Sequence, residues 1–545
     1  MHLPFPCFHT YLTLQAPTAL ISRLMITLDG TRRIEIRPQL IGAVGLTPMP
    51  PDGNSNIVHQ ALLGAVYAYS ARWLLVDNAE SRSTSPKNAW KMKEDLLRYL
   101  WAQAYQKIQP AMTRPSYTSI LALHLFGSTP TASQSEERRV TEMCLGIALQ
   151  HYATMSVRTG FMSRVSKPAG RSSIDMDRPQ APDIAAMEFA QMEDTAHWFG
   201  IICDTSRSLI GCQPSILLPS NTESKVWRSV RQEISDFQQR ARSEHWRDSQ
   251  LPLSIERLYS IVGNGSACRA MVWSAISKVQ EALFHNMTDI SVEGATHHAL
   301  QELDRFNEIF GCLVGICRRD FVLLNEKIRI SCCRFSVCFD TSVTVNLVIA
   351  LLDIEFGLGV LTLVDTLCAT SNAHLLPSEY ELRIISARGI VNAVNLVLHT
   401  DHYSSGNHAS NSNLLQIPYP EHVINALSRA GSSLVHLYRT NFVSASMVEV
   451  MFCVIFTGLE TLQTISYSAE EALEILLPLC NDCGLRPKTY QDSSAAMDPW
   501  NTISPAVGLA LHDKTFLKKL DEHLNIDPGL INSTIERHEV ALSVL

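Results

Sequence analysis

Apolar residues recur every three to four positions along most of the chain, whereas the strict alternation typical of β-strands is scarce. This spacing predicts an all-α fold, a large multi-helix bundle or array in one or two packed helical subdomains. The chain shows no repeat of fixed period, so a solenoid is not expected. The main predicted helices cover residues 57–75, 85–108, 115–127, 135–155, 185–211, 223–242, 254–286, 291–318, 378–398, 421–439, 444–462 and 468–480.

Helix boundaries are signalled by individual residues. Pro115 and Ser116 begin the short apolar helix that Gly127 ends. Ser378 and Glu381 have the spacing of a capping box. The longest apolar run, 344–369, has the length of a membrane span but contains three carboxylates, which are costly in lipid. We therefore expect two buried helices that meet near Gly357.

The segment 196–219, "AHWFGIICDTSRSLIGCQPSILLP", combines an apolar helix with one central carboxylate, Asp204. A helix that is apolar over so wide an arc is expected at the centre of the fold. Asp204 then needs a partner, either Arg207 or Ser208 on the same side or a more distant arginine, and its replacement by alanine is expected to cost about 1–3 kcal/mol. One apolar face is formed by Ala185, Phe189, Met192, Ala196, Phe199 and Cys203.

The end of this helix is also predicted from its residues. Gly211 is expected to adopt the left-handed conformation that ends a helix, and Pro214 blocks its continuation. We interpret the segment as a structural element, because nothing in it resembles a reaction centre.

Polar, proline-bearing stretches divide the chain. We expect an N-terminal segment over 1–54 that is partly irregular, a helical domain over 55–400, a loop over 401–420, and a C-terminal helical region over 421–545 packed on that domain. A further polar excursion over 163–183 is predicted within the helical domain.

The charge of the chain argues against nucleic acid as a direct partner. Charged residues make up 18% of the chain and the formal net charge is −8, so no basic surplus exists to neutralise phosphates. Most of the 14 cysteines lie in apolar runs, which is typical of buried thiols and not of a disulfide framework. The N-terminus lacks the basic start of a signal peptide, so we expect an intracellular chain without a membrane anchor.

Possible metal and redox motifs are incomplete. Cys480 and Cys483 form a C-x-x-C pair without the further ligands that a zinc site needs. The cysteines Cys312, Cys317, Cys332, Cys333 and Cys338 lie close in sequence, but their apolar neighbours indicate core packing. Asp353, Glu355 and Asp365 are too dispersed for a magnesium cluster.

Histidine and glycine motifs are equally weak. The adjacent His297 and His298 point in different directions on a helix, and His197 beside Trp198 is expected to be a core residue. The sequence "VGNGSAC", from Val262, lacks the context of a phosphate loop and is expected to be a turn. We therefore assign no catalytic, cofactor-binding or metal-binding residue, and expect neither enzyme activity nor a cofactor.

The order of several motifs resembles the fungal-specific transcription factor domain, the helical middle homology region of zinc binuclear-cluster regulators. The spacing of Trp198, Asp204, Ser208 and Pro214 is similar to its signature helix. Other similar pieces, in order, are "LLGAVYAYSARWL", "SYTSILALHLFG", "CLGIALQHYATM" with Gly146 and Ala148, and "ISARGIVNAVNLV". The resemblance covers roughly residues 55–400 and continues more loosely to the end of the chain.

The chain departs from that family in three places. Glu193 and Asp194 occupy the region of the family's paired arginines, and Gln213 stands in place of an arginine before Pro214. The family's DNA-reading module needs six closely spaced cysteines, whereas residues 1–54 contain only Cys7.

The resemblance implies a nuclear transcription regulator of a metabolic or secondary-metabolite gene set. Without a zinc cluster, this chain is expected to act through a DNA-binding partner or an upstream zinc module, together with proteins of the transcription machinery. A small-molecule effector in an apolar cavity and a homodimer are both left open. The alternatives are an all-helical enzyme, favoured by a convergent cluster of carboxylates or histidines in one pocket, and a helical adaptor, favoured by an exposed apolar groove without a cavity.

Overall fold

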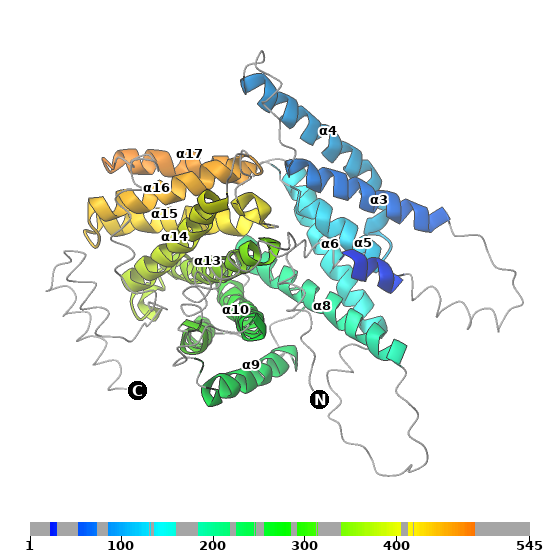
Figure 1. Cartoon of the computed structure of the whole chain (residues 1–545), viewed down its shortest axis with the longest axis horizontal. Coiled ribbons are helices and arrows are strands. Elements are labelled where there is room, and N and C mark those ends of the chain that lie inside the picture. The colour runs from blue at the N-terminus through cyan, green and yellow to red at the C-terminus, as the bar shows by residue number, and fades with distance from the viewer. Residues whose placement is uncertain are drawn as a thin grey trace, which may run out of the picture.

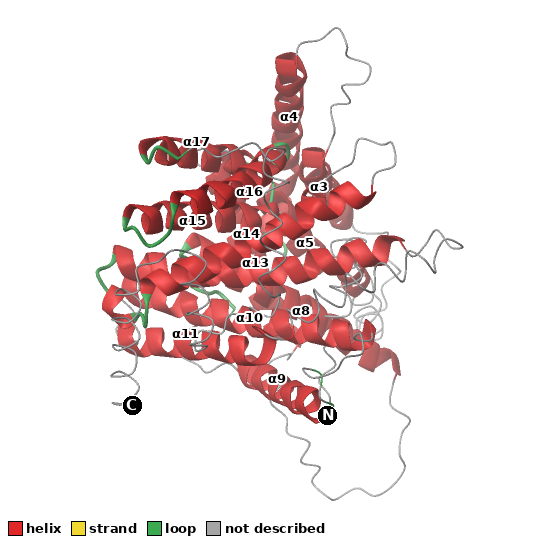
Figure 2. Cartoon of the chain, turned by 60° about the vertical axis from the view of Figure 1, so that its left-hand side comes forward, coloured by secondary structure: helices red, strands yellow, loops and turns green. Residues whose placement is uncertain are grey.

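The chain folds into packed helices, and the part that the structure describes contains no strand (Figure 2). This confirms the all-α prediction in a computed structural model of the full chain. The described residues are 22–29, 53–73, 86–129, 131, 136–159, 184–217, 225–244, 246, 255–284, 291–311, 313, 339–404, 413–417 and 419–485. The predicted excursion 163–183 and the cysteines from Cys317 to Cys338, with Cys312, lie outside these residues.

The helices form two groups joined by a central set (Figure 1). The N-terminal group comprises α3 (Gly53–Ser70) with the short η1 (Ala71–Trp73), α4 (Pro86–Met112), α5 (Tyr117–Gly127) and α6 (Glu136–Thr159). The central set comprises α8 (Ile184–Gly211), α9 (Lys225–Ser243), α10 (Ile255–Phe284) and α11 (Val292–Phe306), which a π-helical turn η2 (Asn307–Gly311) extends.

The C-terminal group comprises α13 (Phe339–Ala369), α14 (Glu379–Ser404), α15 (Pro420–Arg439), α16 (Ala445–Gln463) and α17 (Tyr467–Asp482), with short 3-10 turns η3 (Ala373–Leu375) and η4 (Asn413–Gln416). Helix α13 connects this group to the central set, because it packs against α8 and α10 as well as against α14 and α15. One hydrophobic core runs through all three groups.

The start of α5 shows how local sequence sets an element. Ser116 caps the helix as predicted, and its side chain and that of Ser119 satisfy each other's backbone N–H groups. Asp29, from the short helix over 22–29, accepts hydrogen bonds from the amides of Tyr117 and Thr118 at 3.0 and 2.7 Å. A carboxylate at a helix N-terminus is favourable, so this contact ties the N-terminal segment to the core.

The prediction of two helices that meet near Gly357 is wrong, because α13 is continuous across that residue. Here glycine permits close helix contacts: a Cβ on Gly357 would lie 2.8 Å from the Ile390 side chain on α14. A Cβ on Gly359 would lie 2.9 Å from the Trp273 ring on α10. The two glycines therefore let α14 and α10 approach α13. The packing gained in this way outweighs the low helix propensity of glycine.

The predicted turn from Val262 is also wrong, since that segment lies inside α10. A Cβ on Gly265 would lie 2.8 Å from the Leu352 side chain of α13. The glycine-rich stretch again marks a helix crossing. A close contact of this kind and a turn require the same residue type, so the sequence pattern alone did not separate them.

Helix α8 lies at the centre, as its apolar arc predicted, and residues 195–201 are all buried. Asp204 is fully buried, but its main partners are not those predicted. Its carboxylate accepts hydrogen bonds from the Ser215 hydroxyl at 2.6 Å and from the amides of Ile216 and Leu217 at 2.9 and 2.8 Å. Arg207, one of the predicted partners, forms a longer ion pair with Asp204 at 3.7 Å. Asp204 thus holds the loop that follows the helix.

The helix end is displaced by one residue from the prediction. Gly211 is still helical, and Cys212 takes the left-handed conformation, with φ of 48°. Ser208, proposed as a partner of Asp204, instead donates to the carbonyl of Gln213. Pro214 follows outside the helix, as predicted.

Two helical stretches, Leu347–Ala369 and Ala445–Gln463, are long and apolar enough to cross a membrane by length and composition alone. In this structure their most apolar windows are 78% and 61% buried within the protein. The carboxylate of Asp365 on α13 is paired with Arg383 at 2.7 Å and Arg429 at 2.5 Å. These pairs join α13 to α14 and α15.

The cysteines in the described part of the chain form no disulfide, as the sequence predicted. Cys144 and Cys453 are buried in the apolar core. Cys480 is buried near the end of α17, where burial raises the pKa of its thiol to about 12. The other cysteine of the C-x-x-C motif, Cys483, follows the end of the helix as its C-cap and accepts a hydrogen bond from Nε of Arg439 at 3.3 Å. The contacts of both cysteines are those of structural residues.

Candidate functional site

The candidate site is a cavity of about 570 Å³ where α5, α6 and α8 meet α10, α13 and α15. Arg139 and Glu142 of α6 line it and have side chains 78% and 64% exposed, so the cavity reaches solvent beside this helix. Its size is in the range of small-molecule sites. Its apolar walls are Leu145, Leu149, Ile202, Ile210, Val348, Leu351 and Leu352.

A row of polar side chains crosses one wall of the central cavity. The Ser206 hydroxyl lies 2.7 Å from Nε2 of His422, and Nδ1 of His422 lies 2.8 Å from Oε1 of Glu355. The other carboxylate oxygen of Glu355 accepts a hydrogen bond from Arg269. The row joins α8, α15, α13 and α10, which are distant in sequence.

Trp273 of α10 holds this row in place. Its indole N–H donates to the backbone carbonyl of Glu355 at 2.9 Å, and its ring contacts that of His422 edge-on at 5.4 Å between centroids. The guanidinium of Arg269 lies 4.6 Å from the same ring, which is favourable for a cation. One aromatic side chain therefore orients three members of the row.

The electrostatics of the row favour an ionised Glu355. Burial raises the pKa of this carboxyl group, but the Arg269 guanidinium and the bond from His422 outweigh burial and hold its pKa below the usual range. Arg269 and Glu355 thus form a buried ion pair, with side chains 6% and 16% exposed. An ion pair of this kind is stable only while both partners remain.

Arg72 is a second buried cation beside the cavity. It is 2% exposed, donates to the carbonyls of Tyr69 at 3.1 Å and Ser128 at 2.5 Å, and lies 4.0 Å from the Tyr69 ring centroid. Burial lowers the pKa of its guanidinium, which the charge of Glu421 partly restores. Arg72 therefore ties η1 to the end of α5 beside the cavity.

The polar row has the order of a serine–histidine–acid triad, yet its setting differs from that of a hydrolase nucleophile. Ser206 lies inside α8, where backbone N–H groups donate to helix carbonyls and are not available at the serine as an oxyanion hole. The acid of the row is also paired with Arg269. The arrangement therefore suits recognition of a bound molecule better than attack on one.

The residues considered from sequence lie elsewhere or have other roles. His197 is buried, and burial lowers its pKa to about 4, which keeps the ring neutral. His297 is exposed on α11, while His298 faces a different pocket. Among the described residues, no three His, Cys, Asp or Glu side chains gather as metal ligands. Glu355 is the one member of the Asp353, Glu355 and Asp365 set that lines the cavity.

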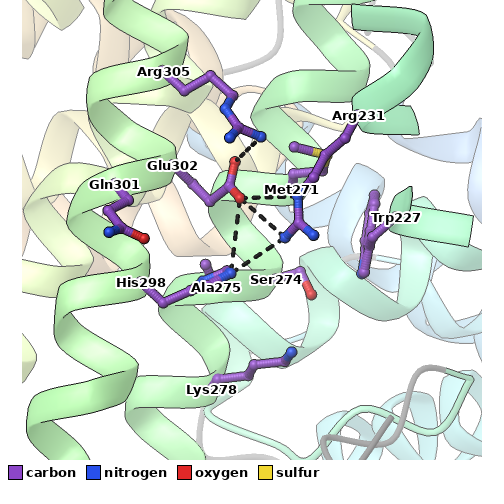
Figure 3. Close-up of a pocket in the computed structure, with 10 residues that line it drawn as sticks. All are labelled: Trp227, Arg231, Met271, Ser274, Ala275, Lys278, His298, Gln301, Glu302 and Arg305. Carbon is purple, nitrogen blue, oxygen red and sulfur yellow. Dashed lines mark hydrogen bonds and ion pairs between the residues drawn. The ribbon is translucent and has the colours of Figure 1, made fainter. Parts of the chain in front are cut away.

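A second, more open pocket of about 650 Å³ lies on α9, α10 and α11 (Figure 3). Arg231 and Arg305 point toward the carboxylate of Glu302, at 3.1 and 3.6 Å, and His298 lies 3.8 Å from it. Trp227 forms one wall. Glu302 is buried, so the surrounding cations compensate its charge, and we interpret this pocket as a structural ion cluster.

Replacing Glu302 by glutamine is expected to lower the pKa of His298. Burial already lowers this pKa, as do the charges of Lys278, Arg231 and Arg305, and Glu302 is the group that raises it. The measurement is an NMR titration of the His298 ring. Glu293→Gln, at an exposed position in the first turn of the same helix, is the control. An unchanged or raised His298 pKa in Glu302→Gln would contradict this interpretation.

Ser206, His422, Arg269 and Arg72 are not among the residues that the sequence motifs indicated as candidates. Arg72 had one signal, a single arginine within an otherwise apolar run. His422 lies just after the predicted loop 401–420 and carried no motif. These residues meet only through packing of helices that are far apart in the chain, so no local spacing could bring them together.

Comparison with known proteins adds no assignment. No protein-family model matches the chain, and searches of curated proteins and of solved structures found no match.

Proposed function

We propose that the chain is a transcription regulator of a metabolic gene set whose helical body responds to a small molecule in the central cavity. The observation that carries this proposal is the cavity itself, which is lined by residues of the N-terminal helices, of α8 and of the C-terminal helices. A ligand there touches all three parts of the fold. It can therefore shift the population of an active arrangement by its differential affinity.

The position of α8 supports the regulatory part of the proposal. The helix that resembles the signature helix of the fungal-specific transcription factor domain forms one wall of the cavity through Ile202, Ser206 and Ile210. The net charge of −8 argues against direct DNA contact by this chain. A DNA-binding partner or an attached zinc module would then supply the contact with DNA, in the nucleus.

The test is a reporter assay in a fungal host with the full chain fused to an unrelated DNA-binding domain. Allosteric couplings typically change an equilibrium several-fold, so we expect the fusion to change transcription by about that factor. We expect Ile202→Trp to alter this change, because the larger side chain fills the cavity. Ile475→Trp is the matched control, because Ile475 is 57% exposed on α17. An inert fusion, or identical output from wild type and Ile202→Trp, would contradict the proposal.

A second candidate is a serine-dependent acyl hydrolase, favoured by the distances between Ser206, His422 and Glu355. A fluorophosphonate probe separates the two. Covalent labelling of wild type that is lost in Ser206→Ala would support the hydrolase, and an unlabelled protein would reject it.

A further inference from the structure

We infer that the central cavity binds an apolar molecule through a neutral carbonyl oxygen, as in a ketone, ester or lactone. This inference deepens the proposed function and depends on it for its biological meaning. Three features of the cavity support it: buried donor atoms without hydrogen-bond partners, charges that are already balanced, and apolar walls.

The cavity has unused hydrogen-bond donors. Nε of Arg269 and Nε of Arg207 are buried without a hydrogen-bond partner, and both residues line the cavity. The Arg269 side chain is 6% exposed, so water does not readily satisfy it. Among the described residues that line the cavity, the buried side-chain nitrogen and oxygen atoms without a hydrogen-bond partner are therefore all donors. A buried donor without a partner is costly, and a ligand that supplies acceptors recovers this cost.

The charges around the cavity are already balanced. Arg269 is paired with Glu355, Arg207 lies 3.7 Å from Asp204, and Arg138 lies 3.0 Å from Glu142. Arg72 faces the charge of Glu421, and Arg139 lies 3.0 Å from Glu136. An anionic ligand would add an uncompensated charge to this balance. A neutral acceptor satisfies the donors without that penalty.

The first turn of α15 adds a favourable helix dipole at one end of the cavity. Pro420, Glu421 and His422 line the cavity, and the positive end of the helix dipole lies in this turn. The apolar walls on α6, α8 and α13 lie beside this polar end. The ligand class that fits is therefore an apolar body with a carbonyl group at one end.

Isothermal titration of the purified full chain with three probes of equal chain length tests this inference. We expect 2-decanone to bind, and decyltrimethylammonium, which has no acceptor, to bind about tenfold more weakly or not at all. Decanoate is expected to bind no more tightly than 2-decanone. Equal binding of the ketone and the ammonium probe, or binding of decanoate alone, would overturn the inference.

Variants locate the contact. Arg269→Lys keeps a cation for Glu355 but removes the Nε donor, and it is expected to weaken 2-decanone binding about tenfold. Arg305→Lys, in the pocket of Figure 3, is the matched control and should leave binding unchanged. Unfolding midpoints verify that both variants fold. If Arg269→Lys does not fold, the probe comparison on wild type still decides the inference.

The two proposals fail separately. A chain that binds 2-decanone but leaves the reporter unchanged refutes the regulatory function and retains the ligand class. A chain that drives the reporter and binds none of the probes retains the regulatory function and refutes the ligand class.

Discussion

Replacing Asp204 by alanine lowers the free energy of unfolding by about 3 kcal/mol, the upper end of the effect expected when a buried charged acceptor is removed. The carboxylate is fully buried and accepts hydrogen bonds from the Ser215 hydroxyl and from the amides of Ile216 and Leu217. Without it, these donors remain in a part-buried loop with no acceptor, and Arg207 loses its counter-charge. Urea denaturation followed by circular dichroism measures the effect.

The matched control is Asp95→Ala on α4. The side chain of Asp95 is 61% exposed and its contact with Arg98 is 3.8 Å long, so its loss should change stability by less than about 0.5 kcal/mol. If Asp204→Ala were as stable as Asp95→Ala, the role of Asp204 as the anchor of the loop after α8 would be refuted.

Replacing Trp273 by alanine has the largest expected effect, about 4 kcal/mol, in the range of buried tryptophan truncations. The side chain is 1% exposed, fills the space over Gly359 and donates to the carbonyl of Glu355. Its loss opens a void between α10 and α13 and removes the support of His422 and Arg269. Thermal and denaturant unfolding measure the change.

Trp273→Phe separates packing from the hydrogen bond. It keeps an aromatic ring over Gly359 but lacks the indole N–H, so we expect a loss of about 1–2 kcal/mol. A Phe variant as unstable as the Ala variant would show that the indole N–H, and not the packing, carries the effect.

Much of the helical framework could be predicted from the sequence because it depends on local patterns. The starts of α5 and α14 follow from Ser116 and Ser378, whose hydroxyls accept from the third residue of each helix. The central place of α8 follows from its wide apolar arc. Such features involve residues within one or two helical turns, where spacing determines contact.

The errors came from residues whose role depends on another helix. Gly357 and the stretch around Gly265 were interpreted as a break and a turn, but each allows a neighbouring helix to approach. Of the partners predicted for Asp204 one turn away, Arg207 is confirmed at 3.7 Å and Ser208 is wrong, while the shorter bonds come from the loop after Pro214, which folds back onto the carboxylate. The polar row of Ser206, His422 and Glu355 was missed for the same reason, because tertiary packing alone brings it together.

The N-terminal and C-terminal boundaries of the expected domains remain predictions. The helices on either side of the predicted boundary near residue 400 pack together, since α14 contacts both α15 and α16. The part of the loop 401–420 that the structure describes includes the end of α14 and the turn η4. Tyr419, in the same predicted loop, stacks on His422 and lines the cavity.

The most direct measurement of the central claim is hydrogen–deuterium exchange of the full chain with and without saturating 2-decanone. A ligand in the central cavity should slow exchange in α8 over residues 201–211 and at the start of α15, where the cavity wall lies. Protection confined to α9 and α11 around Glu302, or no protection anywhere, would contradict a ligand site at the junction of the helix groups.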